Sequence, residues 1–191
     1  MLTVPFPVIY DACVLYPAPL RDLLMRLALT GLFRAHWTER IHHEWMRSVL
    51  ARRPELKPEA LQRTRELMDS AVPDCLVAGY EQLEAGLALK DPDDRHVLAA
   101  AIRCHAGVIV TFNLRDFPQH ALEPFHIEAQ HPDEFIHHLF DLQRGSVCAA
   151  VKAQREALKN PPRTVEECLA TLLAQGLPTT VAALRPMTGL L

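Results

Sequence analysis

The sequence has few cysteines, no long apolar run and no basic leader. Its five cysteines are odd in number, scattered along 191 residues and never spaced as CxxC, which favours free thiols over a disulfide framework or a zinc site. No apolar run approaches the ~20 residues that a membrane helix needs, so we expect no membrane span. No basic segment precedes Asp11, so we expect no signal peptide and a cytoplasmic protein.

Several signature motifs are missing, and each absence removes a class of chemistry. The chain has neither GxxxxGKS/T nor GxGxxG, so it has no glycine-rich loop of the kind that cradles phosphates. It has no GxSxG, so a serine nucleophile of the α/β-hydrolase type is not indicated. The pairs His42-His43 and His137-His138 lack HExxH spacing, and we interpret them as structural. A net charge of −3 is not that of a strongly basic nucleic-acid-binding protein.

The composition is that of a globular protein, and the sequence pattern predicts strands and helices that alternate along the chain. Hydrophobic residues make up 49% and charged residues 23%, which are values of a globular chain. The length of 191 residues suits one domain with an appendage or two small domains. Apolar, β-rich runs predict strands at Val4–Tyr10, Leu32–Trp37 and Val108–Phe112, with shorter ones at Cys75–Ala78 and Phe125–Glu128. Helical spacing and capping residues predict helices from about Pro17 to Gly31, Thr38 to Arg53, Pro58 to Ser70, Tyr80 to Leu89 and Asp91 to Gly107.

The pattern changes in the last third of the chain, where helices follow one another without strands. A helix near Asp133–Leu142 precedes three more at about 146–159, 165–175 and 180–185. Thr164 and Glu167 match a capping box at the start of the second of these three. Alternating strands and helices indicate a parallel α/β sheet. We therefore predict an α/β domain over residues 1–130 and a helical C-terminal extension over 131–191.

Acidic residues come from separate segments that this architecture brings to one edge of the sheet. Asp11 directly follows the first strand, and Asp116 lies just beyond the strand Val108–Phe112. A crossover helix runs antiparallel to its strand, so its N-terminus lies at the same carboxyl edge, where ligands of open parallel sheets bind. The predicted helix start that reaches this edge carries Asp91, Asp93 and Asp94.

Such a cluster has a definite chemistry. Packed carboxylates repel one another and burial raises their pKa values, so they stay ionised only with cations among them. Hard oxygen ligands select Mg²⁺ or Mn²⁺, and two such ions can activate water for in-line attack on a phosphodiester. Each acid also has a structural interpretation: Asp11 as a helix cap, the acids at 91–94 as partners of a helix dipole, and Asp116 in an Asx turn.

Three stretches resemble the PIN-domain ribonucleases that act as toxins in VapBC toxin–antitoxin pairs. They are VIYDACVL at 8–15, DPDDRHVLAAA at 91–101 and TFNLRDF at 111–117, the last fitting the family's T-x-N-x-x-D-F. Their order and spacing together are more specific than any one of them. The resemblance covers about residues 4–130, so it implies a PIN-like parallel sheet flanked by helices, followed by a C-terminal helical appendage.

The resemblance also assigns roles to particular residues. The family's four catalytic and metal-holding acids fall on Asp11, Glu44, Asp94 and Asp116. Asp93 competes with Asp94 for the third position, and Thr111 and Asn113 match supporting polar positions.

Two departures from the family pattern affect these assignments. Many relatives have Asp-Thr-Asn or Asp-Ser-Asn where this chain has Asp11-Ala12-Cys13, so we expect a polar contact to Asp11 to be missing. Glu44 lies beyond the apolar stripe that contains Ile41, and periodicity alone predicts a solvated side chain there.

The resemblance implies a metal-dependent endoribonuclease that hydrolyses phosphodiesters with two Mg²⁺ or Mn²⁺ ions. It also implies an RNA substrate, a cognate antitoxin protein and a homodimer as in many relatives. Residues 34–65 carry eight Lys or Arg and four Asp or Glu, a net +4 against −7 for the rest of the chain. This basic window fits either an RNA path or ordinary solvated helix faces.

Two other function classes stay open. One is a catalytically silent PIN-fold module that binds RNA or protein, which the Ala12-Cys13 departure favours. The other is a Mg²⁺-dependent phosphotransfer or signalling domain, but a receiver-like domain needs a lysine beyond a later strand, and none follows Val108–Phe112.

Overall fold

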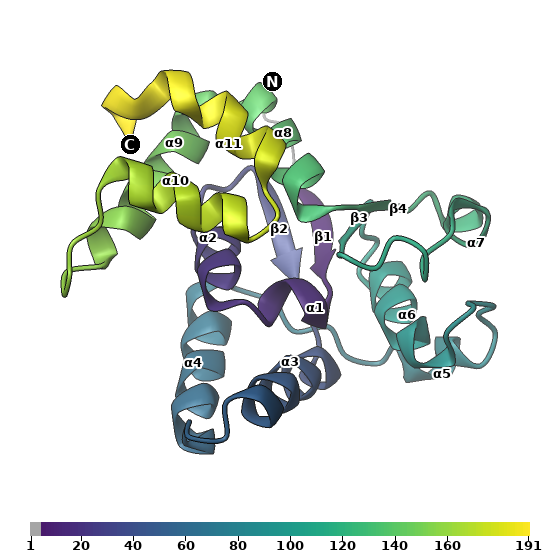
Figure 1. Cartoon of the computed structure of the whole chain (residues 1–191). Helices are drawn as coiled ribbons and strands as arrows, with labels where there is room; N and C mark the ends of the chain where they lie inside the picture. Colours follow the sequence, from purple (N-terminus) through teal and green to yellow (C-terminus); the bar gives the residue numbers. More distant parts are fainter. Residues whose placement is uncertain (1–4) are drawn as a thin grey trace.

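The parallel α/β sheet predicted from the sequence is confirmed (Figure 1). The computed structural model describes residues 5–191, so Val4, where the sequence predicts the first strand to begin, lies outside the described residues. All neighbouring strands are parallel. In sheet order β2-β1-β3-β4, the strands are β2 Phe33–His36, β1 Phe6–Tyr10, β3 Val108–Val110 and β4 Glu128–Gln130.

Helices cover both faces of this sheet, and Figure 1 shows α2 and α6 on opposite sides of it. The helices of the α/β part are α1 Ala12–Leu15, α2 Ala18–Ala28, α3 Glu39–Arg52, α4 Pro58–Ala71, α5 Glu81–Glu84, α6 Arg95–Arg103 and α7 Gln119–Leu122, with 3-10 turns η1 Pro92–Asp94 and η2 Glu123–Phe125. The C-terminal helices are α8 Pro132–Leu142, α9 Arg144–Ala157, α10 Val165–Ala174 and α11 Pro178–Leu184, ending in the 3-10 turn η3 Arg185–Leu190.

Three local predictions were wrong. Residues 75–78 form no strand and make one isolated bridge, from Leu76 to Trp37 just beyond β2. The edge strand begins later than predicted, at Glu128, because Phe125 is the last residue of η2 and His126 after it has a left-handed φ of 56°. The helix predicted over residues 80–89 is a single turn, α5, since Gly86 and the residues after it do not continue it.

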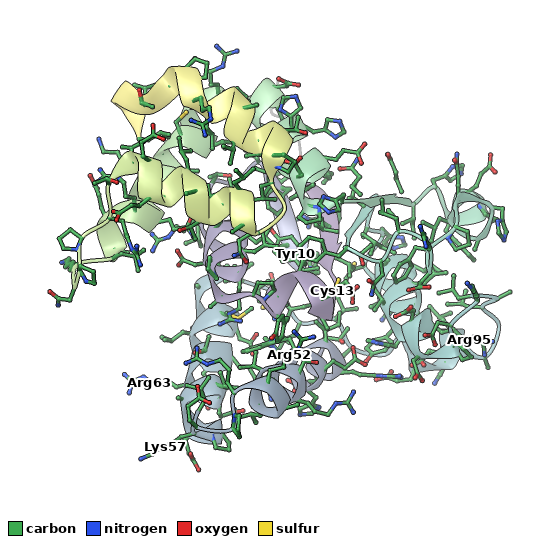
Figure 2. The ribbon with its side chains drawn as sticks, viewed as in Figure 1. Tyr10, Cys13, Arg52, Lys57, Arg63 and Arg95 are labelled. Carbon is green, nitrogen blue, oxygen red and sulfur yellow. The ribbon has the colours of Figure 1, made fainter. Side chains whose placement is uncertain are left out.

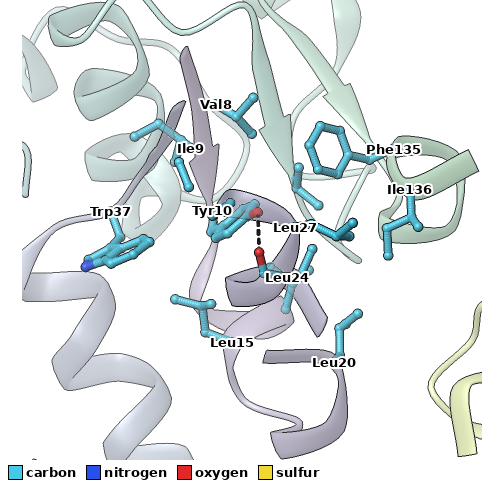
Figure 3. Packing of buried hydrophobic residues seen from close by; sticks show 14 of the residues in the cluster. Val8, Ile9, Tyr10, Leu15, Leu20, Leu24, Leu27, Trp37, Phe135 and Ile136 are labelled. Atoms are coloured by element: carbon cyan, nitrogen blue, oxygen red, sulfur yellow. Dashed lines mark hydrogen bonds between the residues drawn. The ribbon is translucent and has the colours of Figure 1, made fainter. Parts of the chain in front are cut away.

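The core joins the sheet to helices from both ends of the chain (Figure 3). Tyr10 of β1 is fully buried, and its hydroxyl donates to the Leu24 carbonyl of α2 at 3.1 Å. Phe135 of α8 meets the rings of Tyr10 and Phe33 edge-on. α8 packs on the same core as β1, so the core continues across residue 130. The domain boundary predicted at that residue therefore stays a prediction.

A buried polar network fixes the orientation of α3 against α4. The indole N–H of Trp45 donates to His42 Nδ1 at 3.0 Å, so His42 Nε2 carries the proton that faces Asp69 Oδ1 at 2.9 Å. The Trp37 indole N–H also donates to Asp69 Oδ1, at 2.8 Å. Burial lowers the pKa of His42 despite the Asp69 carboxylate, so the network contains a neutral imidazole and confirms a structural role for this histidine.

Two exclusions made from composition can be compared with the structure. All five cysteines are free thiols. Within residues 5–191, no helix is both long enough and apolar enough to cross a membrane.

Candidate active site

The candidate site lies where the strand order of the sheet reverses. β1 pairs with β2 on one side and with β3 on the other, so the chain leaves the carboxyl ends of β1 and β3 in opposite directions. Such a switch point is where open parallel sheets bind ligands. Asp11 comes directly after β1, and its backbone N–H donates to the Val110 carbonyl at 3.1 Å.

A cleft of about 790 Å³ opens at this edge. Its acidic residues come from the end of β1, from α3 and from η1, and the Asn113 loop after β3 completes this end. The lining residues are Asp11, Ala12, Cys13, Tyr16, Arg40, His43, Glu44, Arg47, Ser48, Ala51, Arg52, Asp93, Asp94 and Asn113.

Asp11 is buried and held by two neighbouring side chains. The Thr111 hydroxyl donates to Asp11 Oδ2 at 2.7 Å, and the Cys13 thiol donates to the same oxygen at 3.0 Å. Cys13 Sγ in turn accepts the Phe112 backbone N–H at 3.2 Å. Burial, followed by the Asp11 charge, raises the pKa of Cys13, so the thiol keeps the proton it donates. The contact predicted to be missing at Ala12-Cys13 is therefore present, with sulfur in place of oxygen.

Glu44 is partly buried rather than solvated, which corrects the prediction from periodicity. Its Oε1 lies 3.1 Å from Nε2 of the buried His96 and 3.3 Å from Arg40 Nε. Burial raises the pKa of Glu44, but the contacts with His96 and Arg40 outweigh burial and lower it overall. Arg40 also contacts Glu84 at 3.3 Å and the Asp93 carbonyl at 3.4 Å, so this guanidinium connects α3 to η1.

Asp94 shows the electrostatic character of the cleft. Burial, and then the charges of Asp11, Asp91 and Asp116, raise its pKa to about 7. These acids come from three separate stretches of the chain, and the charge of each adds to burial in favouring the protonated form of Asp94. Asp93 is exposed and lines the cleft, and its backbone N–H donates to Asp91 Oδ1 at 2.9 Å.

The structure brings most, but not all, of the predicted residues to the cleft. Asp11, Glu44, Asp93, Asp94 and Asn113 line it. Thr111 lies beneath it, holding Asp11 and accepting the Asn113 backbone N–H at 3.0 Å. Asp116 is not among the lining residues, although its charge acts on Asp94.

The donor chemistry of the cleft fits a divalent cation, but the donors are not gathered into a coordination sphere. Carboxylate oxygens suit Mg²⁺ and Mn²⁺, and a cation would relieve the repulsion that raises the pKa of Asp94. Among the described residues, however, no three His, Cys, Asp or Glu side chains lie close enough together to hold one ion. Asp11 is held by Thr111, and Glu44 by Arg40 and His96.

Sequence reasoning missed Arg40 and His96 as neighbours of the acids. Arg40 precedes Glu44 by one helical turn, a spacing that predicts an ion pair on a helix. His96 follows Asp94 by two residues, and no sequence signal showed that its ring would be buried against another helix.

Comparison with known proteins agrees with this fold and site. A model of the PIN domain matches residues 7–115, more than half of the chain, so the chain belongs to the PIN-domain family. A second model, described as the VapC50 C-terminal domain, matches residues 132–186.

One known protein is similar to this chain over part of its length. The chain is 43% identical over 94 residues to a protein of Mycobacterium tuberculosis (strain ATCC 25618 / H37Rv) described as "Putative ribonuclease VapC50". The matched segment is 49% of this chain and 55% of the relative, so the chain spans about half the length of that protein. No solved structure matches the chain.

Proposed function

We propose that this protein is a metal-dependent endoribonuclease and the toxin of a toxin–antitoxin pair. The observation that carries the proposal is the cleft at the sheet's switch point, which Asp11, Glu44, Asp93 and Asp94 line from three segments of a PIN fold. The description of the mycobacterial relative as a ribonuclease supports the same activity.

In this proposal each acidic residue has a role in holding Mg²⁺ or Mn²⁺ and orienting the RNA phosphodiester. Asp11, Glu44, Asp94 and Asp116 would hold the ions, and bound ions would supply a nucleophile at neutral pH and stabilise charge that develops on the phosphate. Thr111 and Cys13 fix the rotamer of Asp11, and His96 and Arg40 fix that of Glu44. Asp93 and Asn113 border the space that the substrate enters.

Removal of divalent cations tests the proposal directly. RNA cleavage by the purified protein is expected to stop in excess EDTA and to return when Mg²⁺ or Mn²⁺ is added beyond the chelator, because carboxylates alone repel the phosphate. The measurement follows the ends of an RNA substrate, and cleavage should leave 5′-phosphates. Equal cleavage with and without EDTA would contradict the metal-dependent mechanism.

Replacement of Cys13 tests how Asp11 is held. Cys13→Ala removes a hydrogen-bond donor to Asp11, and Mn²⁺ affinity and cleavage are expected to fall about 10–100-fold, as for other groups that orient metal ligands. Cys13→Ser restores a donor at the same position and should recover most of the loss. Titration with Mn²⁺ measures affinity apart from turnover, and an unaltered affinity in Cys13→Ala would show that Thr111 suffices.

The toxin role adds partners to the proposal. We propose a cognate antitoxin protein, a homodimer and a cytoplasmic RNA target, since the family resemblance implies the first two. Induced expression of the wild-type chain should arrest growth and produce new RNA ends, and co-expression of the protein encoded beside it should prevent both. Growth arrest without new RNA ends would separate toxicity from nuclease activity.

The silent-module alternative loses the support that it had from the sequence and gains one from the structure. The thiol of Cys13 supplies the contact whose loss had favoured it, but the acids are not gathered around a single point. Mn²⁺ binding distinguishes the two functions: a nuclease should bind Mn²⁺ in a manner abolished by Asp11→Asn, whereas a silent module should bind it weakly and be indifferent to that change.

A further inference from the structure

The cleft has a second half that the metal chemistry does not use. Along α3, the residues that line it recur every three or four positions and so form one face of the helix. Beyond Glu44, this face carries no acid as far as the end of α3; its lining residues there are Arg47, Ser48, Ala51 and Arg52. The cleft therefore changes from acidic at the sheet edge to cationic along α3.

Two arginines of this face are not neutralised within the protein. Arg40 is paired with Glu44 and Glu84, and Arg53 with Glu55 at 2.8 Å. In the part of the chain that the structure describes, neither Arg47 nor Arg52 has a carboxylate within ion-pair distance. Their charge is free for an anionic ligand.

An aromatic ring lies beside one of these free charges. The Arg52 guanidinium carbon is 5.8 Å from the centre of the Tyr16 ring, within the range of a cation–π contact. The backbone at Tyr16 is held in place, because Arg21 Nη1 donates to the backbone carbonyls of Leu15 and Tyr16 at 2.6 and 3.3 Å. Arg21 itself stacks at 4.5 Å over the ring of the buried Trp45.

We propose that Tyr16, Arg47 and Arg52 form a nucleotide subsite for single-stranded RNA next to the scissile phosphate, with Tyr16 and Arg52 stacking on a base and Arg47 contacting the backbone. Proteins that bind single strands combine such a cationic groove with an aromatic platform, and arginine planes and tyrosine rings both stack on unpaired bases. The subsite lies in the same cleft as Asp11 and Asp94. The proposal rests on the ribonuclease function proposed above.

The experiment uses a single-stranded RNA that the wild-type protein cleaves, identified by mapping RNA ends. The dissociation constant for this RNA is measured in an Asp94→Asn background, in which cleavage is expected to be slow, and KM is measured in the active protein. Tyr16→Ala and Arg52→Gln are each expected to weaken binding about fivefold or more, with the effect falling on KM. Tyr16→Phe should recover what Tyr16→Ala loses, since the ring is what stacks.

Arg53→Gln is the matched control, because it makes the same charge change at the next residue, outside the cleft. Figure 2 shows the labelled Arg63 at the lower left margin of the molecule and Arg52 nearer its middle, so Arg63→Gln serves as a second, distant control. Arg47→Gln, which removes the proposed backbone contact, should lower the dependence of log Kd on log salt by about one unit of slope.

The outcomes separate the subsite from the proposed function. If Arg52→Gln and Arg53→Gln weaken binding equally, general charge rather than a subsite attracts the RNA, and the subsite is overturned while the nuclease remains. Full affinity in Tyr16→Ala overturns the stacking platform in the same way. If the wild-type protein cleaves no RNA with Mg²⁺ or Mn²⁺, both proposals fail together.

Discussion

Asp94→Asn is expected to lower RNA cleavage on the order of 10²–10³-fold or more while the protein stays folded. Asp94 lies where the charges of Asp11, Asp91 and Asp116 all act, and together with burial they raise its pKa to about 7. Replacing it by an amide removes one of the negative charges that attract a divalent cation. Single-turnover cleavage with Mn²⁺ measures the loss, and circular dichroism confirms the fold.

Two companion variants make this result specific. Asp141→Asn removes one negative charge from an exposed position on α8 and should cleave RNA as the wild type does. Asp93→Asn decides between the two candidates for the third family acid: a smaller loss than in Asp94→Asn supports the present assignment. The reverse order would transfer the role to Asp93.

Asp133→Ala is expected to lower the free energy of unfolding by about 2–4 kcal/mol. Asp133 is buried near the start of α8, where Oδ2 accepts the Thr179 backbone N–H at 2.9 Å and Oδ1 accepts that of Thr180 at 2.8 Å. These two N–H groups belong to the first turn of α11 and have no partner within that helix. Urea denaturation measures the loss, with an unchanged m value if unfolding stays two-state.

The same contact predicts a pH dependence. Burial raises the pKa of Asp133, but the hydrogen bonds from Thr180 and Thr179 outweigh burial and lower it below its usual value of 3.8. A carboxylate whose pKa is lowered in the folded state contributes stability above the unfolded pKa and loses it as pH falls through the folded pKa. The stability gap between wild type and Asp133→Asn should therefore be full above about pH 5 and shrink at lower pH.

The neighbouring Glu134→Gln is the control for these measurements. Glu134 is exposed on the same helix turn, so its replacement should change stability by less than about 0.5 kcal/mol. Equal losses in the two variants would show that charge at the start of α8, rather than the contact with α11, determines stability.

Local sequence patterns predicted the elements whose burial and capping are strong. The helix α3 begins where Thr38 accepts the Ile41 N–H at 3.1 Å, and α10 begins with the predicted capping box at Thr164 and Glu167. The wrong predictions concern short, half-exposed segments. Residues 75–78 are apolar enough for a strand, but a strand requires a paired neighbour, and within residues 5–191 their bridge is to Trp37 alone.

The acidic residues of the candidate site could be predicted from the sequence, but the side chains that contact Glu44 could not. Asp11 and Asp94 follow from strand ends and a helix start, which chain order alone locates at one sheet edge. The contacts of Glu44 with His96 and Arg40 depend on how α3 meets α6 and η1, and no local pattern encodes that angle. The sulfur contact to Asp11 was missed because sequence comparison treats cysteine as an absent polar group, whereas its thiol donates a hydrogen bond.

The two sides of α3 serve different purposes. On its inner side, His42 and Trp45 are tied into the network with Asp69, so that side tolerates little change. On the outer side, Arg47 and Arg52 are exposed and make no ion pair among the described residues. If the proposed subsite binds RNA, substitutions on the outer side would change which RNA is accepted at little cost to the stability of the fold.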